Sequence, residues 1–162
     1  MSSQPDWLSP LILFESCSGD WNVYLHTVYR CFVQDFIHNR VYFNGLPLSL
    51  RRQPIIRDKE ASFWHLVSEG NKEEDRLPDI RRCERICWPR AIIENLHDTR
   101  IKQWKNDRQG QTNVCLWLEE QDYIVILGER AGYNLLLTAY MVTRDHSRRK
   151  LHKEYEDYIR RQ

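Results

Sequence analysis

The spacing of apolar residues changes near residue 100, and this change decides the fold class. Before it, apolar side chains recur at helical intervals from Trp21 to about Ile37, which predicts a long helix. After it, apolar and polar residues alternate in segments separated by short polar turns, as in β-strands. The predicted strands are residues 101–104, 114–118, 123–127 and 133–140. Connections this short favour an antiparallel meander.

Shorter elements complete the predicted fold. Asn44-Gly45 predicts a tight hairpin turn within residues 41–48. Short helices are predicted over residues 59–67, 78–86 and 89–96, with Pro89 in the first turn of the last one. A final helix is predicted from about Arg144. The sequence therefore predicts an α+β domain in which N-terminal helices pack on a C-terminal four-stranded antiparallel meander with a final helix.

Charge is unevenly distributed along a nearly neutral chain. The 162 residues carry a net charge of +1, so no global positive field indicates nucleic acid. Residues 76–90 carry five arginines against Asp79 and Glu84, and residues 144–162 carry seven basic residues against four acids. Such local patches fit a small binding surface for a polyanion. The length fits one domain, divided into an arm, long helix and hairpin (1–58), a core (59–142) and a C-terminal helix (143–162).

The cysteines and the N-terminal sequence favour a cytoplasmic protein with free thiols. The five cysteines are an odd number, and their spacing does not suggest a disulfide framework. The N-terminus lacks a basic start followed by an apolar run, and no stretch of about 18 apolar residues predicts a membrane span. We therefore expect no membrane partner.

Residues 61–90 place a histidine before a cluster of arginines. His65 follows Phe63 and Trp64 on a predicted helix. The arginines are Arg76, Arg81, Arg82, Arg85 and Arg90. Imidazole titrates near neutrality and guanidinium groups match phosphate oxygens, so this set fits acid–base chemistry on a phosphodiester. The alternative is a hydrogen-bonded helix histidine next to a solvated arginine face.

Two pairs on the predicted strands are further candidates. Thr138 and Tyr140 are two residues apart on the last strand, so they share a face and can bind a phosphate or transfer a proton. Alternation places Leu135, Leu137 and Ala139 on the other face, in a core. The alternative for the polar pair is cross-strand hydrogen bonding.

On the first strand of the meander, Lys102 can contact a phosphate while Trp104 stacks on a base, although tryptophan also commonly belongs to a core. Cys83 and Cys87 are four residues apart on a predicted helix, and with His65 or His97 they form a candidate zinc set. Helix packing is the favoured interpretation of these cysteines, because no second Cys/His pair has matching spacing. We expect no metal or cofactor.

The order of these elements resembles the barnase–EndoU–colicin–RelE (BECR) group of metal-independent ribonucleases. The resemblance covers residues 60–142 and depends on the histidine-bearing helix, the arginine-rich helix and a meander that ends in Thr138-Ala139-Tyr140. More narrowly, Phe63-Trp64-His65 and the segments 81–88 and 137–140 are similar to phage- and prophage-associated toxin-like members. The first 58 residues exceed the minimal fold of the group and are expected to hold specificity or a partner surface.

The resemblance implies an endoribonuclease that acts as a toxin or as a phage-defence or prophage effector. The 2′-hydroxyl of RNA would attack the adjacent phosphate, with His65, Arg85, Thr138 and Tyr140 as catalytic residues. Arg81, Arg82, Lys102 and Trp104 are the expected RNA-binding residues, and an antitoxin or immunity protein is an expected partner. Two alternatives remain open: a non-catalytic nucleic-acid-binding domain, and an inhibitor or adaptor module of a mobile element that binds an acidic protein.

Overall fold

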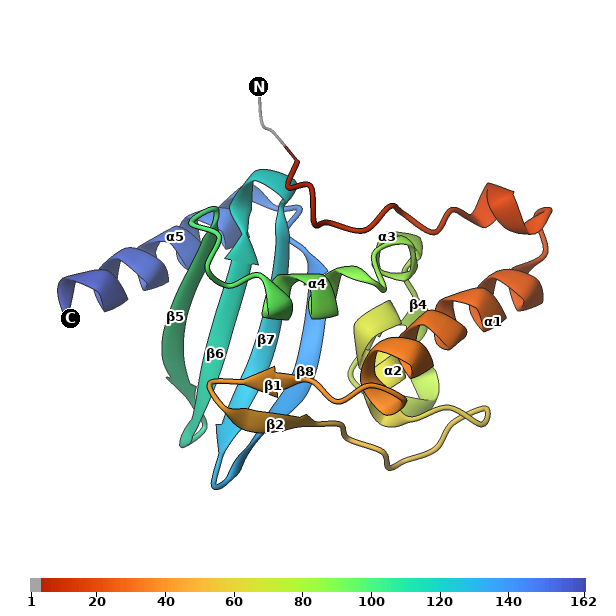
Figure 1. Ribbon diagram of the computed structural model, residues 1–162, viewed down its shortest axis with the longest axis horizontal. Helices are drawn as coiled ribbons and strands as arrows, with labels where there is room; N and C mark the ends of the chain where they lie inside the picture. Colours follow the sequence, from red (N-terminus) through yellow and green to blue (C-terminus); the bar gives the residue numbers. More distant parts are fainter. Residues whose placement is uncertain (1–3) are drawn as a thin grey trace.

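A curled six-stranded sheet forms the centre of the computed structural model, which describes residues 4–162 (Figure 1). In spatial order the strands are β1 (Tyr42–Phe43), β2 (Leu46–Ser49), β8 (Tyr133–Met141), β7 (Tyr123–Arg130), β6 (Gln111–Leu118) and β5 (Ile101–Arg108). The strands β5 to β8 follow each other along the chain and pair antiparallel. The α+β class is confirmed, but the sheet has two more strands than the predicted meander.

The added strands come from the N-terminal third of the chain. The hairpin β1–β2 turns at Asn44 and Gly45, whose φ angles of 52° and 77° suit this Asn-Gly turn. Strand β2 then pairs parallel with β8, so the sheet is mixed. The buried side chain of Asn134 donates a hydrogen bond to the carbonyl oxygen of Phe43 at 2.9 Å, which joins the hairpin to β8. Local periodicity could not predict this pairing because the partners are distant in sequence.

Helices cover one face of the sheet and build the larger core. They are α1 (Trp21–Phe32), α2 (Ala61–Val67), α3 (Ile80–Glu84) and α4 (Trp88–Glu94). Asp20 caps α1, which continues as a π-helical turn, η2 (Val33–Ile37). The helix predicted over 78–86 is shorter, and the α2–α3 connection contains a two-stranded ribbon of β3 (Ser68–Glu69) and β4 (Leu77–Pro78). The core includes Phe32, Phe63, Leu116 and Val125.

The C-terminal helix α5 (Asp145–Arg160) packs on the opposite face of the sheet. A second core lies beneath it, made of Trp104, Cys115, Trp117, Ile124, Val142 and Leu151. The last turns of α5 extend beyond β5 (Figure 1). Within residues 4–162, no helix combines the length and apolar character required to cross a membrane.

An irregularity in β8 changes which of its residues enter the core. Thr138 pairs with Ile126, whereas the next residue of β7, Leu127, pairs with Leu136, so Leu137 is an extra residue in the strand. As a result Leu136 and Ala139, rather than Leu135 and Leu137, belong to the larger core. The expected alternation was wrong on this point because it assumed a regular strand.

The cysteines also differ from expectation. Cys31 of α1 and Cys87 at the start of α4 form a disulfide, whereas free thiols were expected. The other three, Cys17, Cys83 and Cys115, are free and buried. Since α3 ends at Glu84, Cys83 and Cys87 do not share a helix face as expected.

Candidate functional site

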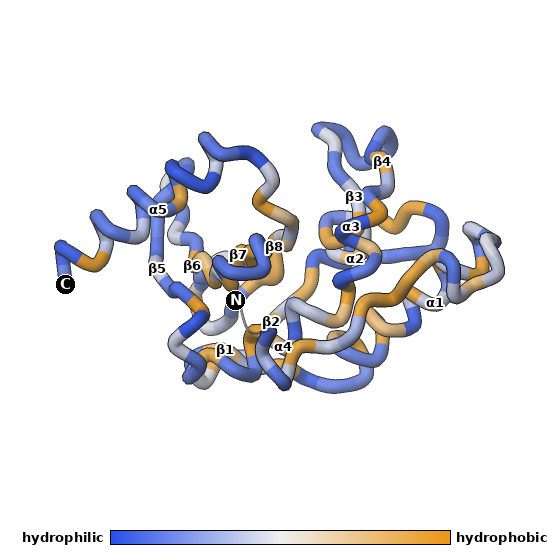
Figure 2. The backbone as a smooth tube through the Cα atoms, turned by 90° about the horizontal axis from the view of Figure 1, so that it is seen from above, coloured by the Kyte–Doolittle hydropathy of each residue, from blue (hydrophilic) through white to orange (hydrophobic). Residues whose placement is uncertain are grey.

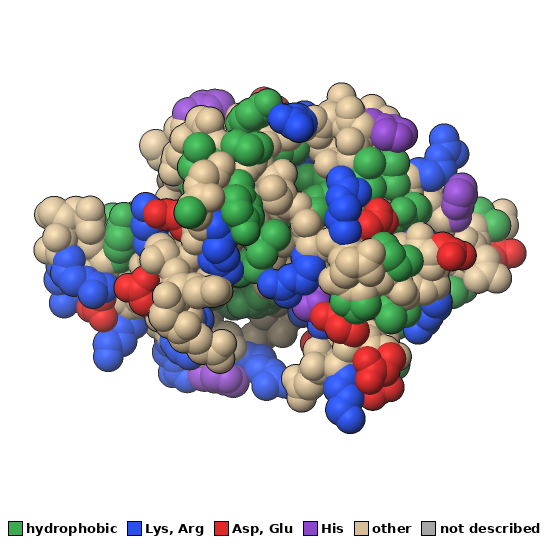
Figure 3. Space-filling view, turned by 90° about the horizontal axis from the view of Figure 1, so that it is seen from below, with side chains coloured by type: hydrophobic (Ala, Val, Ile, Leu, Met, Phe, Trp, Pro, Cys, Tyr) green, Lys and Arg blue, Asp and Glu red, His purple; other side chains and the backbone are tan. Residues whose placement is uncertain are grey.

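Two adjoining hollows form a groove beside the C-terminal half of β8. The first, of about 560 Å³, lies between α3 and the start of α5. The second, of about 320 Å³, lies between the sheet and α5. Tyr140 and Ser147 line both hollows, and we call the continuous depression the groove. The β8–α5 connection and the β3–β4 ribbon lie on its two sides (Figure 2). Figure 3 shows a hollow on this side with Lys and Arg side chains around it.

The groove arises because β8 is only partly paired on this side. In the described part of the chain, β2 pairs with Asn134 and Leu135, near the start of β8. The later residues of β8 instead lie beside α2 and α3, which contact this strand. The chain then turns into α5 after Met141, so helix α3 and the start of α5 are left on opposite sides of the strand edge.

The first hollow carries cations that are available to a ligand. Arg81 and Arg144 are exposed and line it, and within residues 4–162 neither guanidinium has a hydrogen-bond or ion-pair partner. Glu69 and Asp79 also line this hollow, so the cations lie beside two carboxylates. A guanidinium that is not ion-paired keeps its N–H donors available for a phosphate oxygen.

Arg82 and Tyr140 meet at the junction of the two hollows. The guanidinium carbon of Arg82 lies 5.5 Å from the centre of the Tyr140 ring, a cation–π distance. Burial raises the pKa of Tyr140 above its usual range, so its phenol remains protonated and can donate a hydrogen bond at neutral pH. The Arg82 side chain is only 12% exposed, and it donates to the carbonyl oxygen of Ser68 at 2.7 Å. Arg82 therefore stabilises the wall of the groove and also contributes positive charge to it.

His65, near the end of α2, pairs with Glu73 in the loop that follows. The distance from Nε2 of His65 to a Glu73 carboxylate oxygen is 2.7 Å, and the two side chains are 21% and 30% exposed. Burial lowers the pKa of His65, although the hydrogen bond to Glu73 opposes this effect. A neutral imidazole that donates Nε2–H to Glu73 presents the Nδ1 lone pair, for which residues 4–162 provide no hydrogen-bond partner. This arrangement suits a general base.

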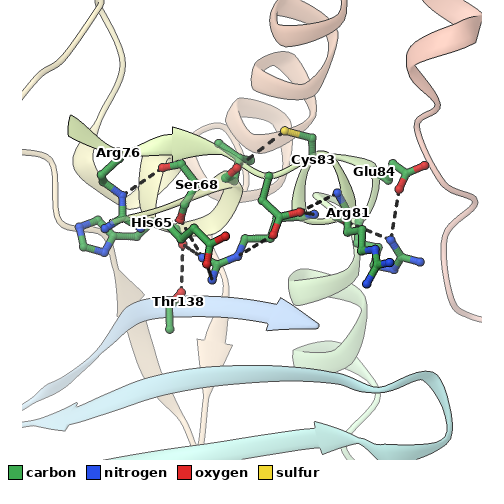
Figure 4. Close-up of polar contacts among 12 residues, drawn as sticks. His65, Ser68, Arg76, Arg81, Cys83, Glu84 and Thr138 are labelled. Carbon is green, nitrogen blue, oxygen red and sulfur yellow. Dashed lines mark hydrogen bonds and ion pairs between the residues drawn. The ribbon is translucent and has the colours of Figure 1, made fainter. Parts of the chain in front are cut away.

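Several side chains fix the backbone around His65 (Figure 4). Thr138 donates to the carbonyl oxygen of His65 at 2.9 Å, and Arg76 donates to the hydroxyl of Ser68 at 3.0 Å. His65 itself lines neither hollow, but Thr138 lines the second and Arg82 lines the first. Of the predicted catalytic residues, the structure therefore brings His65, Thr138 and Tyr140 to the same end of β8.

The fourth predicted catalytic residue, Arg85, lies elsewhere. Its guanidinium lies 5.1 Å from the ring centre of Trp88, and it contacts Glu84 and the carbonyl oxygen of Arg81. Because α3 ends at Glu84, Arg85 does not continue the face that carries Arg82. Among the predicted RNA-binding residues, Arg81 and Arg82 line the groove.

The predicted RNA-binding pair on β5 lies beneath α5. Trp104 is 1% exposed and donates from its indole nitrogen to Glu154 at 3.0 Å, so it is a core residue. Lys102 is ion-paired with Glu119 and lies 5.7 Å from the ring centre of Trp117. Neither side chain lines the groove. Trp104 is thus unable to stack on a base in this structure.

Several residues that line the groove were not predicted from the sequence. Ser147, Lys150 and Arg108 line it, but each stands in a polar segment where solvent exposure is the ordinary expectation. Glu73 belongs to the polar loop 70–76, and only folding brings it to His65. One sequence feature could have indicated part of this set. Arg144, Ser147 and Lys150 follow each other at intervals of three residues, and in a helix this spacing places them on neighbouring turns of one face.

One further cluster has metal-ligand chemistry. Cys31, Asp35 and Cys87 offer ligand atoms within 4.8 Å of one another. The two sulfurs are joined in a disulfide, so in this state they are not thiolate ligands.

Comparisons of the chain with protein-family models, with curated proteins and with solved structures gave no match.

Proposed function

We propose that this chain is a metal-independent endoribonuclease that binds an RNA strand in the groove. The observation that carries the proposal is the His65–Glu73 pair, in which the lowered pKa of His65 favours a neutral imidazole. The backbone of His65 is hydrogen-bonded to Thr138, which lines the groove. The resemblance of the sequence to BECR ribonucleases supports the same activity, and as a toxin or prophage effector the chain would have an antitoxin or immunity protein as partner.

The proposed reaction uses the 2′-hydroxyl of RNA as nucleophile. Nδ1 of His65 accepts the 2′-hydroxyl proton, the 2′-oxygen bonds to phosphorus, and the bond from phosphorus to the 5′-oxygen breaks. The products are a 2′,3′-cyclic phosphate and a 5′-hydroxyl, whose proton comes from the phenol of Tyr140 or from water. Arg82 and Arg81 stabilise the negative charge on the phosphate in the transition state. The strand must continue from the first hollow past Arg82 to reach His65.

The decisive test is cleavage of RNA by purified protein in the presence of EDTA. We expect His65→Ala to lower the cleavage rate by about 10²- to 10⁴-fold, the usual contribution of a general acid or base, while RNA affinity changes only a few-fold. His97→Ala, at an exposed histidine, is the matched control and should cleave at the wild-type rate. A folded His65→Ala protein that cleaves at the wild-type rate would refute the catalytic role.

The pH dependence provides an independent test. Because burial lowers the pKa of His65, the rise of kcat/KM with pH should have its midpoint below about 6.5, the ordinary value for histidine. Glu73 favours the protonated imidazole, so Glu73→Gln should move this midpoint to still lower pH. A midpoint that Glu73→Gln leaves in place would assign the titration to another group.

A second candidate is RNA binding without cleavage. It is favoured by the position of His65, which lines neither hollow. Under this alternative, the wild-type protein and the His65→Ala variant bind RNA with the same affinity. Neither protein produces 2′,3′-cyclic phosphate ends. End-group analysis of RNA after prolonged incubation separates the two functions.

A further inference from the structure

The second hollow contains a polar side chain with an unmet hydrogen-bonding requirement. The amide nitrogen of Asn106 donates to Glu154 at 2.6 Å and lies 3.6 Å from the sulfur of Cys115. These contacts fix the orientation of the Asn106 amide. The Glu154 carboxylate can only accept hydrogen bonds, so the amide nitrogen, and not the amide oxygen, must face it. The amide oxygen is buried and has no partner in the part of the chain that the structure describes. A buried acceptor of this kind indicates a missing donor.

The other walls of this hollow suit a flat heteroaromatic ring. Tyr140 supplies an aromatic surface, and Ile126 and Leu151 supply apolar surface. Asn113 and Thr138 add groups that can donate or accept hydrogen bonds at the edge of a ring. Small-molecule sites commonly combine apolar walls with a few such polar groups.

Cations lie where a sugar-phosphate would leave the hollow. Lys150 and Arg108 are exposed and line it, and Arg108 is also ion-paired with Glu154 at 3.3 Å. Tyr140 and Ser147 also line the first hollow, where the guanidinium groups of Arg81 and Arg144 have no partner among the described residues. One side of the groove therefore suits a base, and the other suits phosphates.

We propose that the second hollow binds a nucleobase, which donates a hydrogen bond to the Asn106 oxygen and stacks on Tyr140. This inference rests on the proposed RNA function and adds the element of base recognition to it. A donor is required, and adenine, cytosine, guanine and uracil each carry an N–H group on the edge used for base pairing. Stacking on an aromatic side chain is a common contribution to binding of single strands.

Calorimetric titration with mononucleotides tests the proposal without a cleavage reaction. The four ribonucleoside 5′-monophosphates are compared with ribose 5-phosphate, which has the same sugar and phosphate but no base. We expect at least one nucleotide to bind ten-fold or more tightly than ribose 5-phosphate. Equal affinity of ribose 5-phosphate and all four nucleotides would overturn the proposal. Failure of cleavage alone would instead affect only the proposed function.

Variants locate the binding site. Asn106→Leu should reduce the preference for the nucleotide over ribose 5-phosphate to about two-fold or less. Since this change also removes the contact with Glu154, Ser147→Phe, which places a ring at the shared wall, provides a second variant that should have the same effect. A full preference in both folded variants would overturn the proposal.

Two surface lysines of α5 provide the matched charge control. Lys150→Glu should weaken nucleotide binding, whereas Lys153→Glu, an exposed lysine that does not line the hollow, should leave it unchanged. Equal effects of the two changes would contradict the placement of the nucleotide in the second hollow.

A trinucleotide that binds at least ten-fold more tightly than the preferred mononucleotide would identify an RNA strand as the source of the base. Similar affinities would identify a free nucleotide, and both results support the pocket.

Discussion

Asp35 has an unusual environment for a carboxyl group. Burial raises its pKa to about 6, although nearby Arg90 acts in the opposite direction. It lies 3.7 Å from the sulfur of Cys31, within the π-helical turn that follows α1. A carboxyl whose pKa is higher in the folded than in the unfolded state is more favourable to folding when protonated. The protonated Asp35 carboxyl therefore stabilises the fold below about pH 4, and this stabilisation is lost as the pH rises through about 6.

This environment predicts a pH-dependent effect of Asp35→Asn. The variant should resemble the wild type in stability at pH 4 and become more stable than the wild type above pH 6, because an amide does not ionise. Urea unfolding at several pH values between 4 and 8 measures the difference. Asp58→Asn, at an exposed aspartate, provides the control. A difference that is constant over this pH range would contradict the assigned cause.

At the scale of elements, the Glu154 carboxylate of α5 joins this helix to strand β5, in addition to the apolar core beneath the helix. This carboxylate accepts hydrogen bonds from Trp104 and Asn106 and pairs with Arg108, all on β5. Removing it leaves a buried indole donor without a partner. We expect Glu154→Ala to lower the free energy of unfolding by about 1–3 kcal/mol, measured by urea denaturation.

The control for this prediction lies on the same helix. Glu156 is 61% exposed in its side chain and pairs only with Arg160 among the described residues, so Glu156→Ala should cost less than about 0.5 kcal/mol. If the two variants lose similar stability, α5 is held by its apolar stripe rather than by Glu154.

Local patterns predicted the helices, the Asn-Gly hairpin and the order of the last four strands, because each depends on residues close in sequence. The sequence could not indicate that β2 pairs with β8, since this contact joins distant segments. Nor could it show that Trp104 is a core residue, because a tryptophan on an alternating strand fits either face. Of the predicted site residues, His65, Thr138 and Tyr140 lie at one end of β8, whereas Arg85 contacts Trp88 instead. Glu73, the partner of His65, comes from a loop without a distinctive pattern.

At the scale of the whole molecule, a net charge of +1 is combined with a basic groove. The proposed binding of RNA should therefore depend on salt through a small number of phosphate contacts. We expect Arg81→Ala and Arg144→Ala each to reduce the slope of log affinity against log salt by about 0.7, the value for one contact to a single strand. Arg160→Ala, on the exposed end of α5, should leave the slope unchanged. Filter binding at several salt concentrations measures these slopes, and unchanged slopes for the first two variants would place the polyanion elsewhere.

The hydrogen bond from Asn134 to the carbonyl oxygen of Phe43 has a consequence for the order of folding. These residues are 91 positions apart, and strand β8 is synthesised long after the hairpin β1–β2. The hairpin that carries Phe43 cannot dock in the sheet while β8 is still absent, and closing so long a loop is slow relative to forming local helices. Since the groove is built around β8 and the start of α5, a nascent chain has no complete site. The ribonuclease activity proposed above would therefore require β8 and the start of α5 to be synthesised and folded before any RNA could be cleaved.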